Sequence, residues 1–463
     1  MATVGMIKIC YIFRSTEDTK MSFPTAVFPE EIDYLIDSLR RFQVYDVGTS
    51  RWFDQNETIM KLTQQAYIEA CSDQEEVVKD RIKVEGKLPL LVHEIHCILV
   101  WKNKLLPILL KEDKLEASFV LYSVLYYELT IVTLLETILF HRGTCEALNE
   151  SALDLTDYCA QVVGLLIGLS YDNKQTVSEQ SNGTLNESAR EEIERLKRDV
   201  DFKIGLKCLT ILSYLTNNIM VLPLSTKNRL TRVHDIPCLI AEILHVKPWI
   251  RRRNGIEKFI DDGWISTCGN DILKVTKHEA QSWFCLFSVL SNNDIMEDYN
   301  INEFRQEQIG KCLGLLNECI LDQLPALVQL KQILSTLKMQ RTKGRGHGGL
   351  LLEELPEIKN DILNEAGKYG WSKIIETHKR TFIELPQEEI SDIAKRLYSA
   401  YNTGLMEIFA YQDKKSSYKF CEVCKKSAEK KCSKCECIFY CSRECQVSDW
   451  TRHKKQCHHL KIV

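Results

Sequence analysis

The sequence lacks the short motifs that mark several common enzyme classes. It contains no P-loop lysine motif, no nucleophile elbow and no protein-kinase motif set. Signals for β-hairpins are few, and the apolar run Met6–Phe13 is too short and too poorly flanked for a convincing signal peptide. These absences disfavour the activities that the motifs serve, an all-β fold and a secreted protein.

Two segments imitate functional motifs but fail on context or spacing. Gly344, Gly346 and Gly349 satisfy G-x-G-x-x-G, yet a helical stretch precedes them where phosphate binding needs a strand. His93 and His96 flank a glutamate, but a metalloprotease box needs its histidines at i and i+4. We expect the first segment to be a flexible connection and the second to carry no metal.

The composition is that of a soluble globular protein. The chain has 463 residues, of which 44% are apolar and 27% charged, and a length of this kind suggests about three domains. Of its nineteen cysteines, eleven are scattered before residue 421, several among apolar neighbours such as Pro237 and Leu239. Free buried cysteine behaves as a small hydrophobe, so we expect a reduced cytosolic protein.

Charge is distributed unevenly along the chain. From Lys414 to Val463 there are thirteen Lys/Arg against five Asp/Glu, a net +8, whereas the whole chain is −4 and the residues before Lys414 therefore carry −12. A basic tail suggests acidic partners. Because no exposed aromatics are interleaved with these lysines, nucleic-acid binding is disfavoured, and a solvated surface explains most of them.

Helical spacing of apolar residues dominates the chain. Pro29 with Glu30 and Glu31 opens the first helix. The residues predicted to lie on buried helix faces are Ile32, Leu35, Ile36 and Leu39; Ile193, Leu196 and Val200; Cys208, Ile211, Leu212 and Leu215; Ala280, Trp283, Phe284 and Phe287; and Leu324, Leu327, Leu330, Leu334 and Leu337. We predict a mostly α fold whose body is a helical repeat of armadillo or HEAT type, although no clean sequence repeat is found.

The most apolar run, Phe119–Phe140, is long enough to span a membrane. Glu128 and Glu136 argue against a span, because a charge near the bilayer centre costs about 3 kcal/mol. We therefore predict a helix buried inside the protein, and no membrane span.

The predicted domain boundaries follow from these patterns. We expect an N-terminal extension at 1–27, a helical body at 28–410 with a disordered polar loop at 171–188, a linker at 411–420 and a metal-binding segment at 421–457.

The last of these segments carries the strongest chemical signal. It reads C-x2-C-x7-C-x2-C-x5-C-x3-C-x7-H-x3-C, and its candidate ligands are Cys421, Cys424, Cys432, Cys435, Cys441, Cys445, His453 and Cys457. Eight such ligands fill two closed tetrahedral Zn²⁺ sites and leave no position for a catalytic water. A disulfide framework would need an oxidising compartment, and an iron–sulfur cluster usually takes four cysteines. Spacing alone leaves open whether the two sites are interleaved or sequential.

The segment resembles the MYND-type zinc finger, down to Tyr440-Cys441, Cys445-Gln446 and Trp450. The resemblance implies interleaved sites, with Cys421, Cys424, Cys441 and Cys445 holding one zinc and Cys432, Cys435, His453 and Cys457 the other. It also implies that the finger docks partners, often proline-containing peptides, near Gln446 and Trp450. The alternative for Trp450 is a core residue of a small domain.

Some MYND proteins are SET-type methyltransferases and others are prolyl hydroxylases. The chain has neither an Asn-His-Ser-Cys-like core nor a histidine followed two residues later by aspartate. We therefore expect no enzymatic activity.

The resemblance extends to the body. It is carried by LVHEIHCILVWKNKLLP (91–107), LDLTDYCAQ (153–161), DIPCLIAEILHVKPWIRR (235–252), ILDQLPALVQL (320–330) and CQVSDWTRHKKQC (445–457). Together these are similar to a family of MYND-finger factors for preassembly of axonemal dynein arms, which motile cilia need.

That similarity implies a cytoplasmic adaptor or co-chaperone, with centriolar satellites and the apical region near ciliary bases as further locations. The implied partners are dynein chains as clients, assembly factors including a leucine-rich-repeat protein, heat-shock chaperones and an immunophilin co-chaperone. The alternative is a nuclear co-repressor adaptor whose finger binds proline-containing motifs.

Overall fold

The computed structural model describes most of the chain. Outside the described residues lie 1–26, 72–74, 113–117, 177–187, 253–254, 340–354, 401–420, 422, 425–427, 429, 435–437 and 463. The glycines at 344, 346 and 349 and the predicted linker at 411–420 therefore fall outside what the structure describes.

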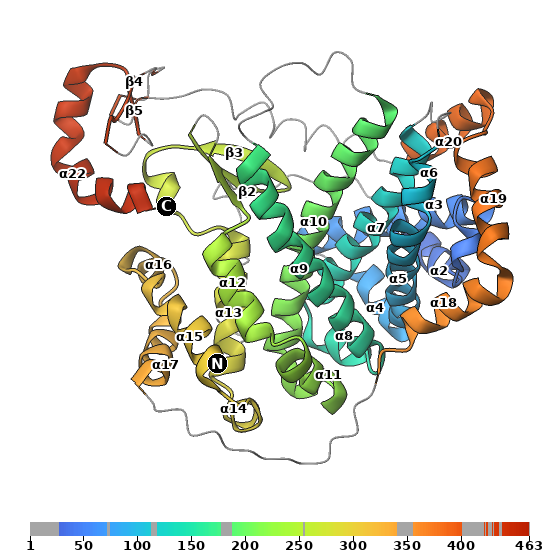
Figure 1. Cartoon of the computed structure of the whole chain (residues 1–463), viewed down its shortest axis with the longest axis horizontal. Coiled ribbons are helices and arrows are strands. Elements are labelled where there is room, and N and C mark those ends of the chain that lie inside the picture. The colour runs from blue at the N-terminus through green and yellow to red at the C-terminus, as the bar shows by residue number, and fades with distance from the viewer. Residues whose placement is uncertain are drawn as a thin grey trace.

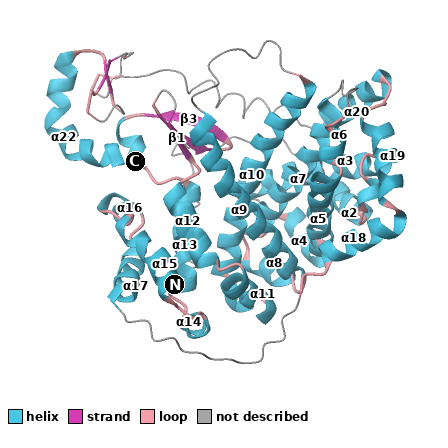
Figure 2. Cartoon of the chain, viewed as in Figure 1, coloured by secondary structure: helices cyan, strands magenta, loops and turns pink. Residues whose placement is uncertain are grey.

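The described part of the chain is mostly helical, as predicted (Figures 1 and 2). The first elements are α2 (Pro29–Ser38), η1 (Val44–Asp46), α3 (Ser50–Cys71), α4 (Val77–Val84), α5 (Leu88–Lys104), α6 (Leu106–Leu109), α7 (Ser118–Ile138), α8 (Arg142–Ala147) and α9 (Ser151–Thr176). Next come α10 (Ala189–Asn217), η2 (Ile219–Val221), α11 (Leu224–Asn228), η3 (Arg229–Val233) and α12 (Ile236–Val246).

Further helices follow a small sheet. They are α13 (Lys277–Leu290), α14 (Asn293–Asp298), α15 (Glu303–Lys311), η5 (Cys312–Gly314), α16 (Glu318–Gln323), α17 (Leu327–Met339), α18 (Ile358–Tyr369), α19 (Trp371–Phe382) and α20 (Gln387–Ala400). Helix α10 lies at the centre and packs on α7, α9 and α13. Helices α18 and α20 return to the N-terminal part of the chain and pack on α5 and α3 (Figure 1).

The predicted helix faces are largely buried, although Leu35, Leu196 and Leu337 are half-buried. In α2, Ile32 and Ile36 are at most 1% exposed, and the helix begins with Pro29 as expected. In α17, Leu327, Leu330 and Leu334 are fully buried. Neighbouring helices cover these apolar stripes, and burial of this kind supplies most of the folding free energy of a helical protein.

Among the described residues, two helices, α7 and α9, are long and apolar enough by composition to cross a membrane. Inside the folded chain, 78% of the apolar window Phe119–Ile138 and 67% of Ser151–Ser170 are buried. The prediction that Phe119–Phe140 forms a helix packed inside protein is therefore confirmed.

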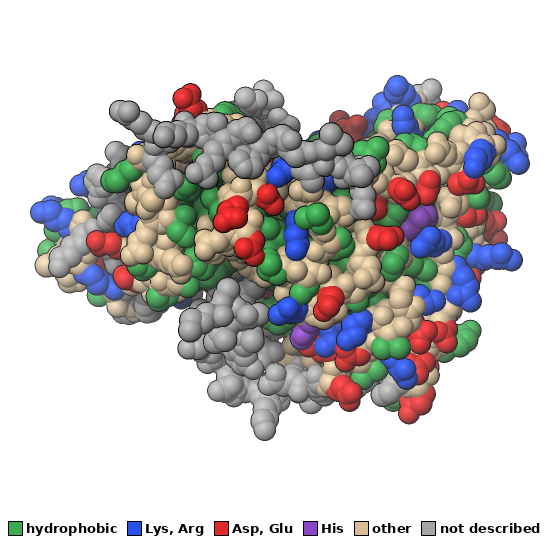
Figure 3. All heavy atoms as spheres, turned by 90° about the horizontal axis from the view of Figure 1, so that it is seen from below, with side chains coloured by type: hydrophobic (Ala, Val, Ile, Leu, Met, Phe, Trp, Pro, Cys, Tyr) green, Lys and Arg blue, Asp and Glu red, His purple; other side chains and the backbone are tan. Residues whose placement is uncertain are grey.

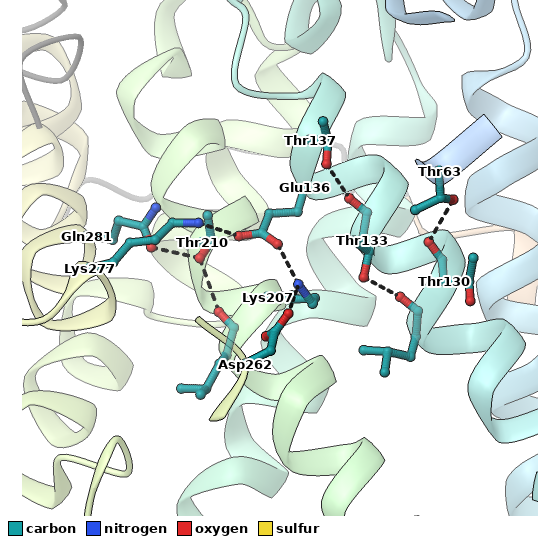
Figure 4. A network of polar contacts seen from close by, with 12 residues as sticks. Thr63, Thr130, Thr133, Glu136, Thr137, Lys207, Thr210, Asp262, Lys277 and Gln281 are labelled. Atoms are coloured by element: carbon teal, nitrogen blue, oxygen red, sulfur yellow. Dashed lines mark hydrogen bonds and ion pairs between the residues drawn. The ribbon is translucent and has the colours of Figure 1, made fainter. Parts of the chain in front are cut away.

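The acidic residues of α7 are paired within the core. Glu136 accepts from Lys207 Nζ on α10 and from Lys277 Nζ on α13, each at 3.0 Å (Figure 4). Burial alone would raise the pKa of Glu136, but the two lysines hold it well below its usual range. Glu128 likewise accepts from Lys102 Nζ at 2.6 Å. The charges that argue against a membrane span thus hold α7 to its neighbours.

An antiparallel sheet was not predicted. Strands β1 (Ile250–Arg252), β2 (Ile256–Ile260) and β3 (Gly263–Thr267) pair in the order β1-β2-β3, and the short helix η4 (Gly269–Leu273) follows. Asp261 and Asp262 form the second turn with φ of 49° and 60°. A two-residue turn with both φ positive matches the twist of the adjoining strands, so the hairpin is built locally.

Two boundaries differ from the prediction. Val27, placed in the extension, is buried and its backbone N–H donates to Gln65 Oε1 at 3.1 Å. Helix α9 continues to Thr176, so the predicted loop at 171–188 is wrong for its first residues. Ser188 caps α10 by accepting from the Glu191 N–H, and this capping box fixes the helix start.

The armadillo or HEAT repeat type stays a prediction.

Candidate metal centre

The C-terminal segment is a short hairpin followed by a helix. Strands β4 (Lys430–Lys431) and β5 (Phe439–Tyr440) pair antiparallel, and α22 (Arg443–Ile462) follows directly. The Cys445 N–H donates to Ser442 Oγ at 3.4 Å, so Ser442 supplies an acceptor at the start of α22. Hairpin and helix together bring cysteines from distant positions into contact.

The first ligand group contains Cys421, Cys424, Cys441 and Cys445, whose sulfur atoms all lie within 4.8 Å of one another. The Sγ–Sγ distances are 3.3 Å for Cys424–Cys441, 3.6 Å for Cys441–Cys445 and 3.9 Å for Cys445–Cys424. Cys441 precedes α22 whereas Cys445 lies within it, so their i,i+4 spacing does not place this pair on one helical turn.

The second ligand group contains Cys432, His453 and Cys457, all buried. His453 Nε2 lies 3.3 Å from Cys432 Sγ. His453 and Cys457 are both on α22, one turn apart, as their spacing predicts. Cys435, the fourth predicted ligand, lies outside the described residues. The described ligands therefore group in the interleaved arrangement that the MYND resemblance implies, rather than in sequential sites.

The geometry of the first group fits Zn²⁺, and the thiol and imidazole donors of the second group are of the kind that zinc prefers. A tetrahedral site with zinc–sulfur bonds of about 2.3 Å separates its sulfur atoms by about 3.8 Å, close to the distances of the first group. Hydrogen bonds with the neighbouring thiols of Cys424, Cys421 and Cys445 raise the pKa of Cys441 to about 12. Four adjacent thiolates repel one another unless a cation lies between them, and a soft donor set of this kind suits zinc.

A polar contact that the sequence did not point to supports the helix. Tyr440 Oη donates to Asp449 Oδ2 at 2.8 Å, and Arg452 Nε donates to Asp449 Oδ1 at 2.8 Å. Tyr440 and Asp449 are both buried. The Tyr440–Asp449 hydrogen bond joins β5 to α22. In the sequence, Asp449 lies between the ligands Cys445 and His453, and its position next to Trp450 is the one signal that could have pointed to it.

The two predicted partner-binding residues lie one turn apart on α22. Gln446 is half-buried, and Trp450 is 36% exposed and makes an edge contact with the His453 ring, with centroids 5.7 Å apart. Trp450 is thus not a core residue. Val447 on the same helix and Val423 beside the first ligand group are also exposed. The finger therefore presents apolar side chains to its surroundings, close to the ligands that hold it together.

The histidines of the apparent protease box lie in the helical core. His96 Nε2 lies 3.1 Å from the Asp154 carbonyl, and Glu94 accepts from the Phe42 N–H at 2.9 Å and from Tyr127 Oη at 3.1 Å. Burial lowers the pKa of His96 to about 4, which keeps the imidazole neutral. Among the described residues, this box forms no group of three or more metal ligands.

Comparison with known proteins agrees with these observations. The MYND finger family matches residues 421–457. The chain is 39% identical over 452 residues to the zinc finger MYND domain-containing protein 10 homolog of Drosophila melanogaster, covering 93% of this chain and 98% of that protein.

A second similarity is far shorter. Ubiquitin carboxyl-terminal hydrolase 19 of Arabidopsis thaliana is 53% identical over 38 residues, which make up 8% of this chain and 6% of that protein. No solved structure matches the chain. The first similarity spans body and finger together, whereas the second is about as long as a finger.

Proposed function

The chain belongs to the zinc finger MYND domain-containing protein 10 family, and from this premise we propose that it is a non-enzymatic cytoplasmic adaptor in the preassembly of axonemal dynein arms. The family and the finger support a protein-interaction adaptor. The dynein clients and the ciliary role are the further step that we propose.

The observation that carries the proposal is the apolar surface beside the ligand groups. Trp450 and Val447 are exposed on α22, whereas its metal ligands His453 and Cys457 are buried and Cys445 is half-buried. A rigid finger with an exposed aromatic loses little entropy on docking, and aromatic anchors dominate many interfaces. We propose that Gln446 and Trp450 contact partner peptides, and that two Zn²⁺ ions hold this surface in shape.

The helical body serves as the second binding region in this proposal. On the face seen in Figure 3, acidic and basic side chains are intermixed over the helices. The body would hold dynein chains or heat-shock chaperones with an immunophilin co-chaperone. The finger would recruit another assembly factor, such as a leucine-rich-repeat protein, in the cytoplasm, at centriolar satellites and near ciliary bases.

A pull-down from ciliating cells tests the proposal. The experiment compares the intact chain with Cys441→Ala, with Trp450→Ala and with a chain that lacks residues 415–463. Phe304→Ala serves as the control, because Phe304 is an aromatic residue of α15 that is 61% exposed and lies outside the finger. We expect the three finger variants to lose one set of dynein-assembly partners and to keep another, and the control to keep both.

Two outcomes would contradict the proposal. If every partner survived deletion of 415–463, the finger would have no adaptor role. If the intact chain recovered only chromatin proteins and accumulated in the nucleus, the co-repressor function would replace the cytoplasmic one.

A further inference from the structure

The three-stranded sheet has two different faces, set by its register. Phe259 of β2 is paired with Trp264 of β3, and side chains of paired residues point to the same side. Both rings lie against Phe202 of α10, with centroid distances of 5.1 Å and 5.4 Å. This face packs on the helical body and belongs to its core.

The opposite face of β2 carries Ile256 and Lys258, which alternate with Phe259 along the strand. Ile256 is 3% exposed, yet it is not part of the hydrophobic cluster that forms the core of the body. Since its side chain is removed from water, another part of the chain must cover it.

Lys258 holds the short helix η4 against the face of β2 that carries Ile256, through hydrogen bonds to backbone carbonyls. Its Nζ donates to the carbonyl oxygens of Asp271 at 3.1 Å, Ile272 at 2.6 Å and Lys274 at 2.5 Å. An ammonium group that is 2% exposed needs such partners to offset its loss of hydration. These hydrogen bonds hold η4 in place, and the side chain of Ile272 in that helix is 2% exposed.

Ile256 and Ile272 form one hydrophobic cluster with the finger. Its buried members from the finger are Cys421, Ala428, Cys432, Ile438, Phe439, Tyr440 and Cys457. Ile250 and Leu273 of the body pack against its margin. Figures 1 and 2 show the finger on the same side of the body as the sheet. The metal ligands are thus part of the surface that covers the sheet.

We propose that the surface formed by Ile256 of the sheet and Ile272 of η4 is the docking site for the chain's own MYND finger, and that this joint closes only when the finger is loaded with zinc. Cys421 belongs to the first ligand group and Cys432 and Cys457 to the second, so zinc bound to both groups would hold these three cysteines in place. Without zinc, the finger residues of the cluster no longer keep their positions, and Ile256 and Ile272 lose the apolar surface that covers them.

The joint also decides which side of the finger faces outward. The cluster turns Ile438 and Phe439 toward the interior, whereas Val447 and Trp450 remain exposed. Docking therefore holds the proposed partner surface in one orientation relative to the helical body. The joint itself does not depend on which partner that surface binds.

Hydrogen exchange of the full chain, followed by mass spectrometry, tests the joint. Peptides covering 256–273 are compared with and without EDTA, and peptides of α10 and α13 serve as internal references. We expect exchange in 256–273 to become at least roughly tenfold faster when zinc is removed, while the reference peptides keep their protection. Unchanged exchange in 256–273 after complete removal of zinc would overturn the proposal.

Ile272→Asp separates the joint from the metal. A buried carboxylate in an apolar cluster is costly, so the variant should undock the finger yet retain its zinc. We expect fast exchange in 256–273 with unchanged zinc content, and no change for the control Val328→Asp, since Val328 is already 47% exposed on α17. Protection that survives in Ile272→Asp overturns the proposal. Should that variant not fold, Ile272→Ala with the same readouts decides.

Discussion

The helical body and the finger of this protein are stabilised in different ways. The body buries long apolar helices such as α7 and α9 around one large core. The finger has a small cluster in which the metal ligands themselves are the buried residues. A segment of about 40 residues cannot bury enough surface to fold alone, so metal binding supplies its folding free energy. Each region should therefore respond to a different perturbation.

The largest expected effect is loss of a finger ligand. Cys432→Ala removes a buried thiol from the second ligand group, and structural zinc sites contribute about 10 kcal/mol or more to folding. We expect the variant to lose zinc and the protection of residues 438–457, while the body keeps its thermal transition. Cys319→Ala, a half-buried cysteine of the body, is the matched control and should keep both. Equal damage from both variants would remove the distinction between the two regions.

The second largest expected effect is a loss of unfolding free energy when a buried ion pair of the body is broken. Glu136→Ala removes the carboxylate that lies 3.0 Å from the buried Lys207 Nζ and leaves that of Asp262 at 3.5 Å. We expect a loss of about 3 kcal/mol in unfolding free energy, measured by urea denaturation, with the zinc content unchanged.

Its control is an exposed pair of the same kind. Asp392→Ala removes an ion pair with Lys395 in which both side chains are about three-quarters exposed, and it should cost less than about 0.5 kcal/mol. Similar losses in the two variants would show that the buried pair contributes nothing specific.

Packing between the returning helices and the N-terminal part can be broken at Gly48. Its φ is +88°, and a Cβ at this position would lie 2.6 Å from Phe382 Cζ on α19. We expect Gly48→Ala to cost about 3 kcal/mol in thermal or urea unfolding. Gly86→Ala isolates the backbone contribution, because Gly86 has a φ of +61° with no atom within 4 Å, and it should cost about 1 kcal/mol. Equal costs would mean that the contact with Phe382 is not tight.

The smallest effect is a dependence on pH that arises in the body. Burial lowers the pKa values of His96 and His278 to about 4, below the value of about 6.5 in an unfolded chain. Between these values only the unfolded state binds the protons, so acidification from pH 6.5 toward pH 4 destabilises the fold. Each histidine should cost about 2 kcal/mol at pH 5.

Asp154 acts in the opposite direction, so stability falls less steeply on acidification than the two histidines alone would predict. Burial raises the pKa of Asp154 to about 6, so below that pH the folded state binds a proton that the unfolded state does not, and this adds stability. Replacing His278 by Gln should flatten the loss of stability between pH 7 and pH 5 in urea denaturation. An unchanged slope would contradict the assignment of a neutral buried imidazole.

The sequence predicted those elements whose cause is local. Pro29 and the apolar spacing of α2 predict that helix, and the length of the run at Phe119 predicts α7. The ligand spacing predicts the metal segment. The hairpin β2–β3 had a local signal in Asp261 and Asp262, but its strands are only five residues long and their period is hard to recognise.

Contacts between distant residues could not be predicted in the same way. Glu136 lies 71 residues from Lys207 and 141 from Lys277, and only the packing of α7 on α10 and α13 brings the three together. Ile256 and Ile272 carry no signal of their own, because an isoleucine in the core and one that covers a finger look alike in sequence. The tertiary arrangement decides their partners.

The most direct test of the separation between body and finger is a chelator titration of the pure protein, with zinc counted by elemental analysis and folding followed by circular dichroism. Our account predicts close to two zinc ions per chain and, after their removal, a small loss of helical signal with the cooperative melting of the body preserved. Far fewer than two zinc ions, or a circular dichroism spectrum and melting curve that do not respond to their removal, would contradict it.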